Sequence, residues 1–130
     1  RIKYRERYKD DLDEFKKRFM KDGLNVVTFG TEGCEPCKEM RKEVYDDKKY
    51  LSQFKDVNFI SIILNEGDNG KYHKALRQRN IIKYHNGVPQ TYFFWYDKNN
   101  DKLQELYYFL GYGPKVKEDL LSEMIEKYNK

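Results

Sequence analysis

The chain has 130 residues, enough for one domain with one hydrophobic core and too few for two ordinary domains. We therefore expect a single domain over residues 1–130. Charged residues make up 37% of the chain with both signs interspersed, and the net charge is +4. A modest charge of mixed sign is not the basic surface that nucleic acids require, so we expect no nucleic-acid function. No apolar run is long enough to cross a bilayer, and the chain itself is not expected to span a membrane.

The first half of the chain predicts a helix, a strand and a second helix. An N-terminal helical extension is expected over residues 1–23, ending near Asp22–Gly23, because apolar residues recur there at spacings of three and four. These residues are Tyr8, Leu12, Phe15 and Phe19. Leu24–Phe29 is apolar and rich in β-branched residues, which predicts a buried strand. Residues 34–54 then predict a kinked or two-piece helix, with Asp46 and Asp47 as candidate caps of its second piece.

The second half predicts a second strand, a short helix, a hairpin and a closing helix. Val57–Leu64 reads as a strand parallel to the first, because a helix connects them. A short helix around residues 72–76 follows. Thr91–Tyr96 and Leu103–Leu110 predict an antiparallel hairpin that ends at Gly111–Pro114, where Tyr112 is expected in a surface turn. The last helix presents one apolar face, formed by Leu120, Leu121, Met124, Ile125 and Tyr128. The fold class is therefore α/β with a mixed sheet.

The two cysteines of the chain, Cys34 and Cys37, stand between the first predicted strand and the helix that follows it. Unpaired N–H groups and the positive end of the helix dipole favour a thiolate at this position, so Cys34 is the expected nucleophile. Cys37 lies one turn further on the same face, where it can bond to Cys34 when oxidised and resolve a mixed disulfide when reduced. The spacing predicts a dithiol redox centre.

Other uses of the two cysteines are less well supported. A zinc site needs four ligands, and the remaining candidates, His73 and His85, are too far apart in sequence. Covalent haem attachment requires a histidine where Lys38 stands. A purely structural disulfide over so short a loop would constrain little chain entropy. We expect no bound metal and no cofactor, and keep as alternatives a module that binds a soft metal such as copper with help from His85, a docking module without turnover, and a disulfide oxidase or isomerase.

This order of elements, with Cys-x-x-Cys at the first strand-to-helix junction, resembles the thioredoxin fold from about Leu24 to the C-terminus. The sequence Cys34-Glu35-Pro36-Cys37-Lys38 is similar to the thioredoxin active site, with Glu35 in the place of a glycine. Gly87-Val88-Pro89 is similar to the cis-proline loop of that family, and Gly111 falls where the family has a glycine after its last strand. The resemblance implies a central sheet of about four strands. It also implies that Pro89 is cis beside the cysteines, and that Glu35, Pro36, Val88 and Pro89 contact an extended substrate segment, which pairs with the backbone of Val88.

The chain departs from this family at three places. Thr28 holds the position of a buried aspartate that assists proton transfer, so another group, or water, must take the proton from Cys37. Gly30 and Gly33 replace tryptophans beside the site, which implies a barer surface around Cys34. The segment Ile82–Asn86 looks like an insertion before the cis-proline loop, where it would reshape the substrate groove.

The residues between the cysteines favour the reducing direction. The Glu35 carboxylate should raise the pKa of Cys34 and weaken the preference for the reduced form, and Pro36 suits the first turn of a helix. We therefore expect a thiol-disulfide oxidoreductase that reduces protein or small-molecule disulfides. Its expected partners are a disulfide-containing protein substrate and an upstream electron donor, for which a membrane thiol reductase is a candidate.

The expected location follows from the resemblance. Residues 37–47 look closest to the extracytoplasmic thioredoxin-like branch, which includes the C-terminal domain of the membrane reductase DsbD and thioredoxins associated with sulfur oxidation. We therefore expect a periplasmic or otherwise extracytoplasmic protein, with the cytoplasm as the alternative, because two cysteines fit either compartment. The sequence begins with Arg1 rather than methionine, so we expect an upstream segment to precede it.

Overall fold

The computed structural model describes the backbone of residues 2–130 and the side chains of residues 7–130. Its centre is a four-stranded sheet in the order β2-β1-β3-β4. The strands are β1 (Gly23–Gly30), β2 (Val57–Ile63), β3 (Gln90–Asp97) and β4 (Lys102–Leu110). β1 is parallel to β2 and antiparallel to β3, and β3 and β4 form an antiparallel hairpin. The predicted α/β fold with a mixed sheet of about four strands is confirmed.

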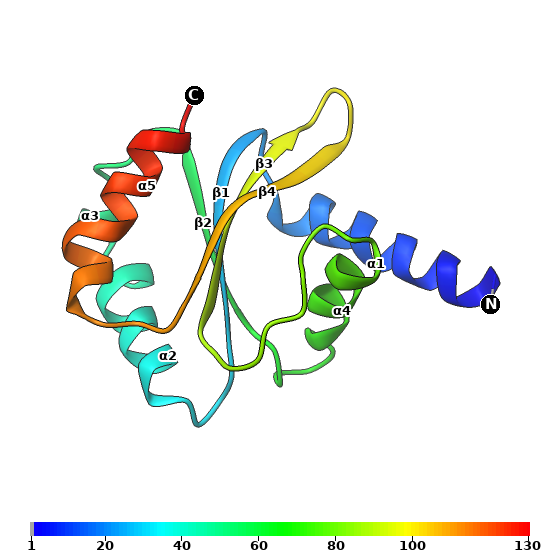
Figure 1. The fold of residues 1–130 in the computed structure, drawn as a ribbon, viewed down its shortest axis with the longest axis horizontal. Coiled ribbons are helices and arrows are strands. Elements are labelled where there is room, and N and C mark those ends of the chain that lie inside the picture. Colours follow the sequence, from blue (N-terminus) through cyan, green and yellow to red (C-terminus); the bar gives the residue numbers. More distant parts are fainter. Residues whose placement is uncertain (1) are drawn as a thin grey trace.

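Helices cover both faces of the sheet (Figure 1). One face carries α1 (Ile2–Phe19) and α4 (Gly70–Gln78). The other carries α2 (Glu35–Met40), η1 (Arg41–Tyr45), α3 (Lys48–Leu51), η2 (Val116–Leu120) and α5 (Leu121–Tyr128), where η marks a π-helical turn. The sheet therefore separates two hydrophobic clusters.

The central strand β1 supplies side chains to both clusters. Successive side chains of a strand point to opposite faces, so Val27 and Phe29 join the cluster under α1 and α4, while Leu24 and Val26 join the other. All four are buried, because β1 has neighbours on both edges and helices on both faces. The apolar run that predicted this strand reflects that double burial.

The first helix ends earlier than its apolar spacing predicted. α1 stops at Phe19 instead of near Asp22–Gly23. The Asn25 side chain accepts a hydrogen bond from the Lys21 N–H (2.9 Å) and donates to the carbonyl oxygens of Lys21 and Gly23 (2.8 and 3.0 Å). The Asn58 amide donates to the carbonyl oxygen of Phe19 (2.7 Å) and so satisfies a terminal helix carbonyl. Residues 20–22 are irregular, with a bend at Asp22, and Gly23, at a φ of +100°, begins β1.

The helix after the cysteines is divided, as its sequence predicted. The α2 helix passes into the π-turn η1, in which the Asp46 N–H donates to the carbonyl oxygen of Arg41 (2.7 Å). A new helix, α3, begins after Asp47, whose side chain accepts a hydrogen bond from the Tyr50 N–H (3.0 Å). The prediction of Asp47 as a cap is confirmed, because this bond satisfies one of the free N–H groups at the start of α3.

Replacing the buried ring of Phe15 is predicted to show that α1 belongs to the core. Phe15 has 0% exposure and contacts the rings of Phe29, Tyr72 and Phe94. Phe15→Ala should therefore lower the free energy of unfolding by about 3–5 kcal/mol, measured by urea denaturation. The exposed control Lys17→Ala should stay within about 0.5 kcal/mol of the wild type. Equal stability of the two variants would mean that α1 is a detachable extension.

Candidate active site

The loop between β1 and α2 delivers Cys34 to the start of a helix. The chain leaves the sheet at Gly30 and turns at Gly33, whose φ of +85° favours glycine. The Glu32 N–H donates to the Asn65 side chain (2.8 Å), which ties the loop to the segment after β2. Cys34 then occupies the N-cap position of α2. The end of the central strand thus determines where the first sulfur lies.

Cys34 and Cys37 form a disulfide, with their Cα atoms 5.2 Å apart. The Cys34 sulfur accepts a hydrogen bond from the Cys37 N–H (3.2 Å), so a free N–H of the helix start points at this sulfur. Cys34 is partly exposed, while Cys37 is 2% exposed. Glu35 and Pro36, in the first turn of α2, are both exposed beside Cys34. A reagent from solvent therefore reaches Cys34 before Cys37.

The loop with Val88 and Pro89 lies against the disulfide. The Val88 carbonyl oxygen is 3.9 Å from Cys34 Sγ, and the peptide bond between Val88 and Pro89 is cis. The Gly111 N–H donates to the Pro89 carbonyl oxygen (2.9 Å), and the Gln90 side-chain amide donates to the Gly87 carbonyl oxygen (2.8 Å). These bonds hold the loop beside the cysteines from two sides.

The segment Ile82–Asn86 packs onto the sheet. Ile82 is buried in the cluster under α1 and α4, and the His85 ring stacks on Tyr108 of β4 with 4.0 Å between ring centroids. The Gln90 side chain donates a hydrogen bond to the His85 carbonyl oxygen (2.9 Å). His85 therefore packs against β4, and its hydrogen bond with Gln90 connects the segment to the residue that follows Pro89.

Both ring nitrogens of the second histidine, His73, have partners within the protein. His73 is buried, and its Nε2 lies 2.8 Å from Gln90 Oε1, while its Nδ1 accepts a hydrogen bond from Arg77 (3.1 Å). Burial lowers the pKa of His73, so it is neutral at physiological pH. Within residues 7–130, no three His, Cys, Asp or Glu side chains gather closely enough to hold a metal ion.

Between β1, β3 and η1 lies a buried cluster of hydroxyl groups. Thr28, at the position of the expected aspartate, is 2.8 Å from the Thr91 hydroxyl and accepts a hydrogen bond from the Tyr45 hydroxyl (2.6 Å). Burial raises the pKa of Tyr45, which stays neutral at physiological pH. The hydroxyls of Thr28 and Thr91 lie 3.9 Å from the sulfur of Met40. These groups satisfy one another, and none of them is a carboxylate that could take a proton from Cys37.

Tyr45 and Thr91 did not stand out in the sequence. Tyr45 lies seventeen residues from Thr28 and Thr91 sixty-three residues away, on a different strand. The sequence held one signal, Thr28 itself, because a buried threonine in an otherwise apolar strand needs a polar partner on a neighbouring element. Identifying that partner required the pairing of β1 with β3, in which Thr28 lies opposite Thr91.

Gly30 is buried, so it does not contribute to a bare surface around Cys34 as the sequence suggested. A Cβ atom built on Gly30 would lie 3.0 Å from both Cβ and Sγ of Cys37 and 3.7 Å from Nη1 of Arg41. Cys37 therefore packs into the space that a side chain at position 30 would need, and Arg41 lies beside it at an ordinary van der Waals distance. Gly33, in contrast, is exposed.

The charge of Glu35 is largely offset. Its carboxylate is 80% exposed and lies 3.6 Å from the ammonium group of Lys38, one turn further along α2. Water and the neighbouring cation both screen a charge in this position. The effect on Cys34 that the sequence assigned to Glu35 is therefore weaker than an isolated carboxylate would produce.

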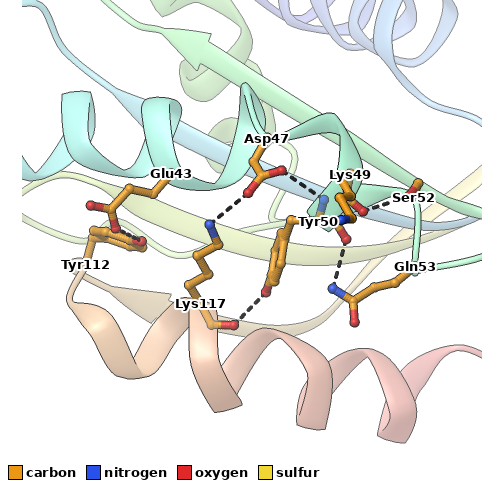
Figure 2. Close-up of polar contacts among 8 residues, drawn as sticks. All are labelled: Glu43, Asp47, Lys49, Tyr50, Ser52, Gln53, Tyr112 and Lys117. Carbon is orange, nitrogen blue, oxygen red and sulfur yellow. Dashed lines mark hydrogen bonds and ion pairs between the residues drawn. The ribbon is translucent and has the colours of Figure 1, made fainter.

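A second set of contacts ties the segment after β4 to the helices that follow the cysteines (Figure 2). The Tyr112 hydroxyl donates to the Glu43 carboxylate of η1 (2.6 Å), and burial together with Glu43 raises the pKa of Tyr112. Lys117 pairs with Asp47 (3.0 Å), and the Tyr50 hydroxyl donates to the Lys117 carbonyl oxygen (2.7 Å). Tyr112, predicted in a surface turn, is partly buried and anchored in this way.

Replacing Gly30 by alanine is predicted to disturb the packing of Cys37. The new Cβ would stand 3.0 Å from Cys37 Cβ and Sγ, closer than ordinary contacts, so α2 or the sulfur must shift. We expect Gly30→Ala to lower the free energy of unfolding of the oxidised protein by about 1–3 kcal/mol in urea denaturation. The control is Gly113→Ala, where the described residues leave open space around the new atom. Equal stability of the two variants would contradict the contact.

The described part of the chain contains no helix that is both long and apolar enough to cross a membrane. In sequence comparisons the chain matches no family model and no curated protein.

Solved structures show the same fold at low sequence identity. Thioredoxin from Trichomonas vaginalis is similar with a TM-score of 0.61 and 20% identity, over 94% of this chain and 91% of that one. Fasciola hepatica thioredoxin has a TM-score of 0.57 and 19% identity, over 93% of this chain and 94% of that one. Oxidised thioredoxin O2 from Arabidopsis thaliana has a TM-score of 0.57 and 17% identity, over 94% of this chain and 90% of that one. The chain therefore has the thioredoxin fold, with its two cysteines bonded at the start of α2, an arrangement that supports thiol-disulfide exchange.

Proposed function

We propose that this protein is a thiol-disulfide oxidoreductase that works mainly as a reductase of disulfides. The observation that carries the proposal is the asymmetry of the pair: Cys34 is partly exposed at a helix N-cap, and Cys37 is buried behind it at disulfide distance. An accessible sulfur that faces helix N–H groups is suited to attack. A buried sulfur one turn away is suited to complete the exchange.

The reaction uses both sulfurs in turn. In the reduced protein, the Cys34 thiolate attacks a sulfur of the substrate disulfide, the substrate S–S bond breaks, and a mixed disulfide forms. The Cys37 thiolate then attacks Cys34, which releases the second substrate thiolate and leaves the protein disulfide. An upstream electron donor must reduce this bond before the next cycle.

Three residues around Cys34 are proposed to contact the substrate, and the expected fourth, Pro89, is buried and is proposed to support them. Glu35 and Pro36 are exposed on one side of Cys34, and the Val88 carbonyl lies beside its sulfur. A backbone carbonyl there can pair with an extended segment that carries the substrate cysteine. Pro89 is buried beneath and supports Val88.

The reducing direction rests on the sequence between the cysteines. Pro36 lies in the first turn of α2, as in the thioredoxin active-site sequence that this motif resembles. The charge of Glu35 acts in the same direction, although its pairing with Lys38 diminishes it.

The proposed partners are a disulfide-containing protein as substrate and a membrane thiol reductase as electron donor. Both, and an extracytoplasmic location such as the periplasm, are supported by the resemblance of residues 37–47 to the extracytoplasmic branch of thioredoxin-like proteins. Isolation of the mixed disulfide formed by the Cys37→Ser protein in native extract would identify the substrate and, through it, the compartment.

Substitution of each cysteine by serine tests the mechanism. Cys34→Ser should reduce insulin no faster than the uncatalysed background, because the attacking sulfur is gone. Cys37→Ser should also lose turnover, but it should accumulate covalent complexes with the substrate, visible on non-reducing gels. Insulin reduction at wild-type rate by both variants would exclude the proposed enzyme.

A redox titration against glutathione tests the direction separately. We expect a potential nearer to the value of about −270 mV for thioredoxin than to the value of about −120 mV for DsbA. The fraction of reduced protein is measured by thiol alkylation at each glutathione ratio. A value near that of DsbA would indicate an oxidase with the same two cysteines.

A further inference from the structure

Arg41, a side chain with a permanent positive charge, shares the space beside Gly30 with Cys37. A Cβ atom built on Gly30 would lie 3.0 Å from Cys37 Sγ and 3.7 Å from Arg41 Nη1. Both atoms lie close to one point, so their separation is shorter than the Debye length of about 8 Å at physiological ionic strength. A Cβ atom at position 30 would crowd Cys37 and would touch Arg41 at an ordinary van der Waals distance.

Local helix geometry brings Arg41 to this position. Arg41 follows Cys37 by four residues, a spacing that places two side chains on the same face of a helix. Its backbone N–H donates to the carbonyl oxygen of Cys37 at the junction of α2 and η1. An arginine side chain supplies a delocalised positive charge and five N–H donors.

Neither Lys38 nor the Val88–Pro89 loop supplies a free positive charge to Cys37. Lys38 is paired with Glu35 on the exposed side of α2. The Val88–Pro89 loop places the Val88 carbonyl oxygen, which does not titrate, 3.9 Å from the Cys34 sulfur. Among residues 7–130, Arg41 takes part in no ion pair. The hydroxyl groups of Thr28 and Thr91, which lie 3.9 Å from the sulfur of Met40 one turn along the helix from Cys37, carry no charge.

We propose that Arg41 stabilises the thiolate of Cys37 and so replaces, by its charge, the carboxylate that the described site lacks. The inference rests on the proposed function, in which Cys37 must lose a proton before it attacks Cys34. A nearby positive charge favours the ionised form of a thiol and makes a dedicated base less necessary. Arg41 acts on the reaction through Cys37 and is a positioning residue.

The step that Arg41 assists is the release of substrate. Cys37 gives its proton to water, and the resulting thiolate attacks Cys34 Sγ in the mixed disulfide. The bond between Cys34 and the substrate sulfur breaks as the bond between the two protein sulfurs forms. The substrate leaves as a thiolate and takes up a proton from water. Two electrons pass in all from the protein dithiol to the substrate disulfide.

Titration of Cys37 tests the proposal without reference to turnover. In the reduced Cys34→Ser protein, the thiolate of Cys37 is followed by its ultraviolet absorbance against pH. Arg41→Gln, added to this background, should raise the pKa of Cys37 by about one unit, because the charge is lost. Arg41→Lys should retain most of the wild-type value. The matched control is Lys42→Gln, which removes the same charge from the next, exposed residue and should leave the pKa unchanged.

The rate of substrate release gives a second readout in the protein with both cysteines. Arg41→Gln should slow release about threefold at neutral pH, because the tenfold loss of thiolate is partly offset by the greater nucleophilicity of a thiol with a higher pKa. The pH profile of release should move upward by the same unit, and Arg41→Lys should restore it.

Failure of this inference and failure of the proposed function are distinguishable. An unchanged Cys37 pKa in Arg41→Gln, or an equal rise in Lys42→Gln, would overturn the role of Arg41 while insulin reduction by the wild type still supports a reductase. A raised pKa in Arg41→Gln alone would support the charge interaction. If the wild type then failed to reduce insulin, the proposed function would be wrong.

Discussion

The packing of Cys37 against the backbone of Gly30 is the contact on which the geometry of the site depends. Gly30 is the last residue of the central strand, and its carbonyl oxygen accepts a hydrogen bond from the Leu64 N–H after β2 (2.8 Å). Strands on both edges of β1 and helices on both faces hold this end in place. Because the built Cβ at Gly30 meets Cys37 at 3.0 Å, the helix can lie this close only over a glycine. The rigid core thereby determines the position of the buried sulfur, and through the helix that of Cys34.

The remainder of the site is assembled from segments far apart in the chain and joined by specific hydrogen bonds. Gly111 after β4 bonds to Pro89, and its neighbour Tyr112 reaches Glu43 on η1. The loop, the segment after β4 and the helical unit with Cys37 are thus connected in one ring of contacts around the disulfide. The charged groups of this site differ from those that the thioredoxin resemblance implied, because Thr28 has a hydroxyl group where a carboxylate was expected. A cation beside a thiol lowers the pKa of that thiol. Neutral hydroxyl groups do not act as a base, so the proton of the thiol must pass to water.

The sequence predicted most of the fold because its signals are local. The apolar run of β1, the split helix and the cap at Asp47 depend on neighbours within a few residues, and the structure has them where the pattern placed them. The predicted end of α1 was wrong by three or four residues, since the Asn58 amide binds the carbonyl oxygen of Phe19 and the Asn25 amide binds the backbone of Lys21. Asn58 lies thirty-nine residues from Phe19, and apolar spacing carries no information about such a partner.

For the site, the sequence by itself determined the two sulfurs, their spacing and their place at a helix start, because these are set by consecutive residues. Only the tertiary structure decided what surrounds them. It showed that Gly30 is a buried contact with Cys37, that the Val88 carbonyl oxygen lies 3.9 Å from the Cys34 sulfur, and that Thr28 meets Thr91 across the sheet. The charge a thiol experiences is a sum over groups brought together by folding, and it falls off over distances comparable to the site itself. The sequence determines which charged residues are present, and the fold determines which of them lie close enough to a sulfur to change its pKa.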